Sequence, residues 1–491
     1  MRRTFLSLAL VIGCVLVLAA CGSKNKSSSV SAKTTSSDPS SIAGADVVPA
    51  SATVFASVNT DSASAQWTQA MTLLSSVPSL QKGLDKSLSS SGITLADVEG
   101  ALGPTTVFVQ LGSSAKPTEV FLSNPADSSK LKALLAKDKK EKSVTADVGS
   151  WLAFAKSQAA LDQFNTAAAN GKLADSSNFK AALASVPSDA LVKAYFDGSA
   201  INASSLSSLG SSSTSKALSG AIAKNKLDWG TVSVSAASKG LSIEGTFKGK
   251  TSLANASSSL VDQLPSGTSF AVDLSGKALG LDKAVQNLAN NKKYASQIPA
   301  IEAALGVKLD DLAALAGSEM SIYGTESGIG LLVKAQDAAK SKAMLDKAVK
   351  LLAAQLNGSS KSVTVGGVQA TELTFGKTNV YYGVKDGNLF VVTGASAIPG
   401  SSKLSSDVAY AASAGELTVP ASNLGVVYLD FAKLAALSKS GSPLVGSLSG
   451  SLGSSKSATA NLSSLDGLSS LLGYASANAD KVEFKAFLST K

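Results

Sequence analysis

Residues 48–58 read VPASATVFASV, and residues 264–274 read LPSGTSFAVDL. Each stretch opens on a proline in a turn-like segment and continues into a mostly apolar strand, and the two agree in character position by position. A match of this kind at two distant places in one chain predicts an internal duplication.

Further blocks match in the same order along the chain. Residues 92–98 (GITLADV) match 306–312 (GVKLDDL), and residues 186–187 with 195–197 (VP, YFD) match 419–420 with 428–430 (VP, YLD). Matching blocks that keep their order indicate that the chain contains two related units rather than chance similarities.

The spacing between the two copies changes along the chain. Gly92 recurs as Gly306, 214 positions later, whereas the strand that begins at Trp151 recurs at Leu389, 238 positions later. The 24 additional residues predict an extra strand pair in the second unit. We place this pair in 363–385, because a Gly-Gly centre between apolar runs is typical of a tight hairpin turn.

Periodicity within each unit is mixed. Residues 229–248 alternate around Ser238-Lys239-Gly240, as expected of an antiparallel hairpin with one solvated face, and 472–488 are expected to form the equivalent hairpin. Helical spacing occurs at Leu131, Leu134 and Leu135, and again in 338–355, where it predicts an apolar stripe made of Ala339, Ala343, Leu345, Ala348, Leu351 and Leu352. We therefore predict the α+β class: two tandem, duplicated units, 47–250 and 251–491, each with a mainly antiparallel sheet and packed helices.

The N-terminus is typical of an export signal. Arg2 and Arg3 precede an apolar run, and the segment ends in Leu18-Ala19-Ala20-Cys21-Gly22, which resembles the lipobox of bacterial lipoproteins. We expect residues 1–20 to be removed and Cys21 to be the lipid attachment site. Residues 21–46 then form a lipidated cysteine and a flexible, Ser- and Lys-rich tether. This predicts a lipid-anchored protein on the extracytoplasmic face of the cell membrane.

Composition excludes several classes of chemistry. The chain has no histidine, and of its two cysteines Cys14 lies in the signal segment while Cys21 is the expected lipid site. We therefore expect no Ser-His-Asp triad, no His-based zinc site, no thiol nucleophile and no internal disulfide. The net charge of +9 includes Arg2 and Arg3, so +7 remains once they are removed, and lysine carries all of the remaining positive charge. Lysine lacks the planar phosphate-binding fork of arginine, and aromatics are 5% of the chain, so we expect no nucleic-acid binding.

Few of the remaining residues indicate catalysis. Ser-x-x-Lys spacing occurs at Ser79/Lys82, Ser129/Lys132, Ser177/Lys180 and Ser213/Lys216, without the Lys-Thr-Gly companion of penicillin-binding enzymes. Asp310 and Asp311 suit the first turn of a helix. Asp197 and Asp430 each end a strand with the pattern Tyr-x-Asp. Such an aspartate is either a carboxylate that faces a ligand or, in the interpretation we prefer, the cap of the helix that follows. Three tryptophans are expected to anchor the core rather than line a pocket: Trp67, Trp151 and Trp229.

Together, the block at 48–58, the passage from Leu95 to Gly103 and the second copy resemble the actinobacterial DUF3352 family of envelope proteins. This resemblance implies no substrate, cofactor, metal or catalytic residue. We expect a non-catalytic binding or structural module of the cell envelope. Its partner is the membrane, through the lipid on Cys21, together with a hydrophobic ligand, an envelope polymer or a protein. The alternatives are a carrier of a lipid or other hydrophobic ligand, and a Ser/Lys-dependent hydrolase.

Overall fold

The computed structural model describes residues 42–112, 117–137, 143–198, 227–250, 253–278, 280–291, 295–355, 358–376, 378–400, 402–439 and 466–491. The chain divides into two compact units. Unit 1 comprises Met1–Thr251, Ser449–Ser469 and Asn478–Lys491, and unit 2 comprises Ser252–Leu448 and Ser470–Ala477. Cys21, the signal segment and nearly all of the tether lie outside the described residues, as does the pair Ser213/Lys216.

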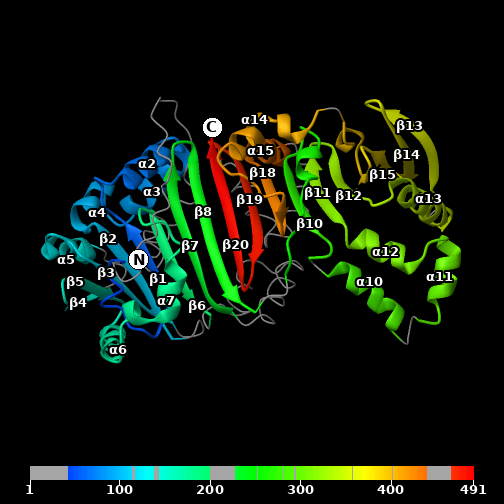
Figure 1. Cartoon of the computed structure of the whole chain (residues 1–491). Coiled ribbons are helices and arrows are strands. Elements are labelled where there is room, and N and C mark those ends of the chain that lie inside the picture. Colours follow the sequence, from blue (N-terminus) through cyan, green and yellow to red (C-terminus); the bar gives the residue numbers. More distant parts are fainter. Residues whose placement is uncertain are drawn as a thin grey trace. The chain divides into compact units, whose positions relative to one another are not determined.

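Unit 1 is built on an antiparallel sheet (Figure 1). In spatial order its strands are β4 (Val144–Val148), β5 (Trp151–Ala155), β3 (Thr118–Ser123), β2 (Thr105–Leu111), β1 (Ala52–Asn59), β6 (Val192–Asp197), β7 (Leu227–Ala237), β8 (Gly240–Gly249) and β20 (Lys481–Thr490). Its helices are α2 (Ala65–Ser75), α3 (Pro78–Ser89), α4 (Leu95–Ala101), α5 (Ser128–Lys137), α6 (Gln158–Ala169) and α7 (Ser177–Leu183), with the 3-10 turn η2 (Leu173–Asp175).

Unit 2 repeats this plan. Its strands, in spatial order, are β13 (Ser359–Val365), β14 (Val368–Phe375), β15 (Thr378–Lys385), β16 (Asn388–Val392), β12 (Gly328–Lys334), β11 (Glu319–Thr325), β10 (Phe270–Ser275), β18 (Gly425–Asp430) and β19 (Leu468–Asn478). A separate two-stranded sheet pairs β9 (Ala256–Ser257) with β17 (Ser422–Asn423). The helices are α10 (Leu281–Asn290), α11 (Ile298–Leu305), α12 (Leu309–Ala316), α13 (Ala338–Gln355), α14 (Val408–Ala414) and α15 (Phe431–Lys439), with the 3-10 turns η3 (Val261–Gln263), η4 (Ala395–Ala397) and η5 (Leu404–Ser406).

Identical backbone contacts show that the two units are copies. Pro49 forms an isolated bridge to Lys172, and Pro265 forms the same bridge to Lys403. The Ala52 N–H donates to the Pro49 carbonyl at 3.0 Å, as the Thr268 N–H does to the Pro265 carbonyl at 3.0 Å. The proline of the repeated block therefore performs the same turn in both units, and the predicted α+β class with duplicated units is confirmed.

The extra strand pair of the second unit is β13 with β14. Their turn is Gly366-Gly367, whose φ angles of 58° and 80° are available to glycine without steric cost. β15 pairs with β16 as β4 pairs with β5, so the insertion is Ser359–Phe375. The turn lies where the sequence predicted it, but the pair begins earlier than 363 and excludes β15.

Two other expectations differ from the structure. The two glycines of Gly328-Ile329-Gly330-Leu331 predict a hairpin turn, but this stretch belongs to strand β12, and the turn is Glu326-Ser327 just before it. The last strand, β20, pairs along its length with β8 and lies in unit 1, although we assigned 251–491 to the second unit. A strand whose hydrogen bonds are satisfied by β8 groups with that sheet, whatever its place in the sequence.

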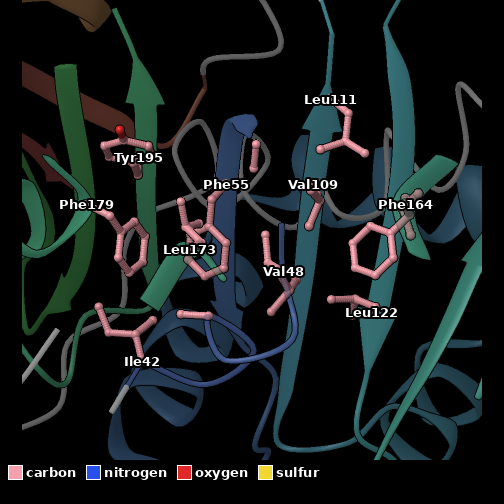
Figure 2. Close-up of a cluster of buried hydrophobic side chains, with 14 of the residues drawn as sticks. Ile42, Val48, Phe55, Val109, Leu111, Leu122, Phe164, Leu173, Phe179 and Tyr195 are labelled. Atoms are coloured by element: carbon pink, nitrogen blue, oxygen red, sulfur yellow. The ribbon is translucent and has the colours of Figure 1, made fainter. Parts of the chain in front are cut away.

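The core of unit 1 is apolar and continuous (Figure 2). Phe55 from β1 meets the edge of Phe179 from α7, with ring centroids 5.3 Å apart, and Phe179 meets Tyr195 from β6 in the same way at 5.3 Å. Such edge-to-face contacts stabilise a core beyond the area that they bury. Within the part of the chain that the structure describes, no helix combines the length and apolar character needed to cross a membrane.

Candidate functional site

The structure places the residues singled out from the sequence in structural roles. Trp67, Trp151 and Trp229 are buried, as expected of core anchors. Asp310 and Asp311 lie in the first turn of α12, as predicted, and Asp311 pairs with Lys340.

The described Ser-x-x-Lys pairs lie on helices, at Ser79/Lys82 (α3), Ser129/Lys132 (α5) and Ser177/Lys180 (α7). In the second pair, Ser129 Oγ donates to Asp127 at 2.5 Å, and Lys132 is 3.7 Å from Asp147. Each side chain of that pair is therefore engaged by a different aspartate rather than by its partner.

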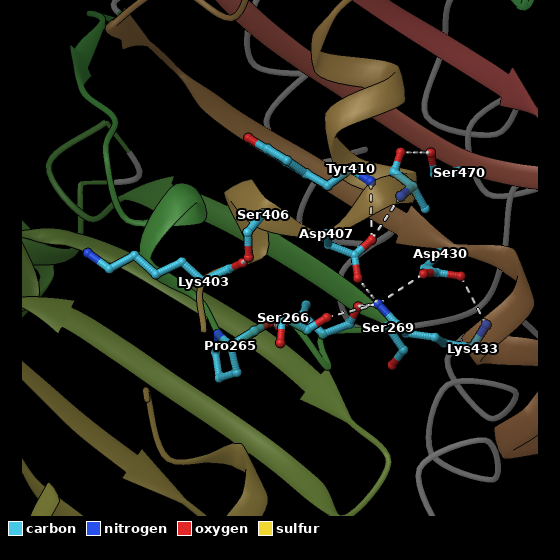
Figure 3. A network of polar contacts seen from close by, with 12 residues as sticks. Pro265, Ser266, Ser269, Lys403, Ser406, Asp407, Tyr410, Asp430, Lys433 and Ser470 are labelled. Carbon is cyan, nitrogen blue, oxygen red and sulfur yellow. Dashed lines mark hydrogen bonds and ion pairs between the residues drawn. The ribbon is translucent and has the colours of Figure 1, made fainter. Parts of the chain in front are cut away.

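Asp430, by contrast, belongs to a buried charged cluster in unit 2 (Figure 3). The Lys433 N–H donates to Asp430 Oδ1 at 2.9 Å, so Asp430 caps α15, as the preferred interpretation holds. Lys433 Nζ also lies 3.1 Å from Asp430 Oδ2 and 2.6 Å from Asp407 Oδ2. For Asp197, the residues after Gly198 lie outside the described ranges, so no following helix is described that it could cap.

The Lys433 ammonium has more protein acceptors around it than the three hydrogens that it can donate. Besides the two carboxylates, it donates to the backbone carbonyls of Ser266 at 2.9 Å and Thr268 at 3.3 Å. Asp407 in turn caps α14 through the N–H groups of Ala409 and Tyr410. These contacts hold the proline turn, α14 and α15 together.

A second buried polar cluster lies on the same face of the unit 2 sheet. Glu319 on β11 accepts hydrogen bonds from the backbone N–H groups of Ser259 and Leu260, and Lys334 Nζ lies 3.4 Å from its Oε2. Asp273 on β10 is 1% exposed, and its Oδ2 has no hydrogen-bond partner among the described residues. Burial, reinforced by the charge of Glu319, raises the pKa of Asp273 to about 8, so Asp273 is protonated at neutral pH.

The corresponding positions of unit 1 carry no such charges. Strand register aligns Asp273 with Ser57 and Glu319 with Thr105, because β1 pairs with β2 and β6 as β10 pairs with β11 and β18. The same register aligns buried Ser321 with Val107. Unit 2 therefore has two acids where unit 1 has uncharged hydroxyl side chains, and a serine where unit 1 has a valine. Within the described residues, no group of three or more acidic or cysteine side chains could hold a metal ion.

Unit 2 also contains a groove between α12 and α13. It has a volume of about 280 Å³, and its apolar lining includes Val307, Leu315 and Met344. Charged residues lie along it, with Asp311 and Lys340 joined by a 2.7 Å ion pair. This contact lowers the pKa of Asp311 and raises the pKa of Lys340. The groove was not predicted from the sequence, because we expected the apolar stripe of α13 to pack against the rest of the unit.

That stripe is only partly buried. Ala339 and Ala343 are exposed, and Leu345 and Ala348 are half-buried. Among the α13 side chains that the structure describes, Ala353 is the buried one. α13 therefore leaves part of its predicted apolar stripe uncovered.

Comparisons with known proteins identify a family but no activity. No curated protein gives a significant match. Two solved structures show a weak likeness, crystal forms I and III of TP0453, at 13% and 10% identity. The alignments cover 48% and 47% of this chain and 79% and 93% of the other, with TM-scores of 0.22 and 0.21, which are too low to carry an argument. Residues 127–470 match the model of a family described as "Protein of unknown function (DUF3352)". Since that match spans well over half of the chain, the protein belongs to the DUF3352 family.

Proposed function

We propose that this protein is anchored by lipid on Cys21 to the extracytoplasmic face of a bacterial cell membrane and works there as a non-catalytic binding module. The observation that carries the proposal is Leu18-Ala19-Ala20-Cys21-Gly22 at the end of an export-type signal. Small residues before a cysteine are what a lipoprotein signal requires, and two or more acyl chains make such anchoring durable.

The binding half of the proposal rests on unit 2. The groove between α12 and α13 combines an apolar lining with a few charged groups, which is the usual construction of a small-ligand site. The described lysines with the most contacts support folding rather than catalysis, Lys433 above all, because its donors are used by carboxylates and carbonyls. Of the alternative functions, the groove and the engaged lysines favour a carrier of a hydrophobic ligand.

Anchoring is tested in cells that make the complete chain. Metabolic labelling with a clickable fatty acid is expected to tag the wild type and to leave Cys21→Ser unlabelled, and inhibition of the lipoprotein signal peptidase is expected to accumulate the precursor. Cys14→Ser is the matched control, because Cys14 lies in the segment expected to be removed. Equal labelling of wild type and Cys21→Ser, or release of unlabelled wild type into the medium, would contradict the anchor.

A further inference from the structure

The groove of unit 2 occupies a place that is filled in unit 1. In this part of the fold, equivalent positions of the two units are 210 residues apart in sequence. Val120 aligns with Gly330 through the strand register, and the helices α5 and α13 begin at Ser128 and Ala338. Leu131 and Leu134 therefore correspond to Ser341 and Met344. The two leucines are 0% and 3% exposed in unit 1, whereas both unit 2 residues are half-buried and line the groove.

This difference is a loss of packing in one copy only. Replacing buried leucines with a serine and a flexible methionine removes branched side chains that would otherwise join α12 to α13. Leu315 on α12 is also half-buried, whereas the smaller Ala101 at the aligned position of α4 is 4% exposed. The apolar lining that remains is suited to a flexible alkyl chain, which methionine can accommodate.

The charged side chains along the groove are not all paired with an opposite charge. Asp311 is paired with Lys340, and Asp337 accepts the Lys340 N–H at 2.9 Å, so these three groups form a closed cluster. Lys347 lies seven residues further along α13, about 10 Å away at 1.5 Å per residue, and makes no hydrogen bond or ion pair with any described residue. Its Nζ approaches Gly306, where an added Cβ would be 2.4 Å from it. One end of the groove therefore presents an unneutralised cation.

We propose that this groove binds a medium-chain fatty acid, with the carboxylate on Lys347 and the alkyl chain along Met344 and Leu315. The inference deepens the proposed binding role of unit 2 and is independent of the lipid on Cys21. A volume of about 280 Å³ lies at the lower limit of small-ligand sites, which suits one alkyl chain and excludes a two-chain lipid. The carboxylate complements the charge of Lys347.

The test is isothermal titration calorimetry with decanoate on residues 22–491, which include every residue that the structure describes. Decanoate is expected to bind, and decyltrimethylammonium, which has the same chain length and the opposite charge, is not. Lys347→Gln is expected to weaken decanoate binding roughly tenfold, as loss of one charge-assisted contact does. Lys350→Gln, an exposed lysine on the same helix, is the matched control and is expected to bind as the wild type does.

The double variant Ser341→Leu/Met344→Leu restores the residues of unit 1 and is expected to abolish binding while keeping the circular dichroism spectrum. If that variant does not fold, the Lys347→Gln and decyltrimethylammonium results decide. Binding of the cationic analogue equal to that of decanoate, unchanged affinity in Lys347→Gln, or no decanoate binding to the wild type would each overturn the proposal. Anchoring is measured by fatty-acid labelling in cells, so either proposal can fail without the other.

Discussion

Unit 1 and unit 2 share one topology but differ inside. At the centre of unit 1, Phe55, Phe179 and Tyr195 stack edge to face. In unit 2 the first two of these positions hold Ala271 and Tyr410, and Tyr410 packs on Tyr428 with centroids 5.2 Å apart. The aromatic pair is kept, but Tyr410 adds a hydroxyl where unit 1 has Phe179, and this hydroxyl donates to Asp262 at 2.7 Å. The hydroxyl of Tyr428, which aligns with Tyr195, has no partner among the described residues.

The difference shows which contacts the fold requires. Both units keep the proline turn, the strand order and an aromatic pair beneath the sheet. They differ where unit 1 has Ser57 and unit 2 has the buried acid Asp273. They differ again where unit 1 has Leu131 and unit 2 has Ser341, which leaves a space unfilled. The fold tolerates both differences. Since buried polar groups and voids each cost stability, we infer that unit 1 serves mainly as scaffold and that unit 2 has given up packing along the groove that we propose as a ligand site.

The largest expected effect is in the core of unit 1. Phe179→Ala is expected to lower the free energy of unfolding by about 3–5 kcal/mol, because it leaves a cavity between Phe55 and Tyr195. Urea unfolding followed by circular dichroism measures this change. Tyr410→Ala is the matched variant in unit 2. An equal or larger loss from Tyr410→Ala would contradict the view that unit 1 has the more tightly packed core.

The next effect is the pH dependence of unit 2. Because the pKa of Asp273 is about 8 in the folded state against 3.8 ordinarily, the protonated carboxyl stabilises the fold fully below about pH 4. That stability is lost as pH rises toward 8, by about 1.4 kcal/mol per pH unit. Between pH 5 and pH 7, the wild type should therefore lose roughly 2–3 kcal/mol relative to Asp273→Asn.

Unfolding curves of both proteins at pH 5, 6 and 7 measure this difference. The control is Ser57→Asn, which places the same amide at the aligned position of unit 1 and removes no titratable group, so we expect no change of slope with pH. Parallel pH profiles for the wild type and Asp273→Asn would show that Asp273 ionises in the folded protein as it does in water.

A smaller effect is expected at the Lys433 cluster. Lys433→Met leaves Asp407 and Asp430, whose side chains are 15% and 4% exposed, without their cation. We expect a loss of about 2 kcal/mol, below the range for a fully buried pair because the Lys433 side chain is itself 32% exposed. Adding Asp430→Asn should recover part of the loss, and thermal melts of the single and double variants test this coupling. Strictly additive losses would mean that Lys433 and Asp430 do not interact.

The smallest effect concerns filling the groove. Ser341→Leu alone is expected to raise the free energy of unfolding by about 1 kcal/mol, because it buries apolar surface against α12. Leu131→Ser, the reverse change in unit 1, is expected to be strongly destabilising, since Leu131 is fully buried. Differential scanning calorimetry compares the two. Destabilisation by Ser341→Leu would indicate that the groove has no room for the larger side chain.

Much of the fold could be predicted from the sequence, because the duplication repeats the same turn and strand patterns in both units. The blocks at 48–58 and 264–274 predicted equivalent turns, and the Gly366-Gly367 turn identified the inserted hairpin. The pairing of β20 with β8 was not predictable, since it depends on which strand edge is free in space. The groove was missed for a similar reason: Ser341 and Met344 suit an ordinary amphipathic helix, and only alignment with Leu131 and Leu134 through the sheet shows what is absent.

Methyl NMR of methionine distinguishes a ligand-binding groove in unit 2 from a mere packing defect. Residues 22–491 contain three methionines: Met344 in the groove, Met320 on β11 and Met71 in unit 1. On titration with decanoate, we expect a saturable shift of the Met344 methyl resonance while that of Met71 stays in place. A Met344 resonance that does not move, or equal shifts of Met344 and Met71, would contradict ligand binding at the groove.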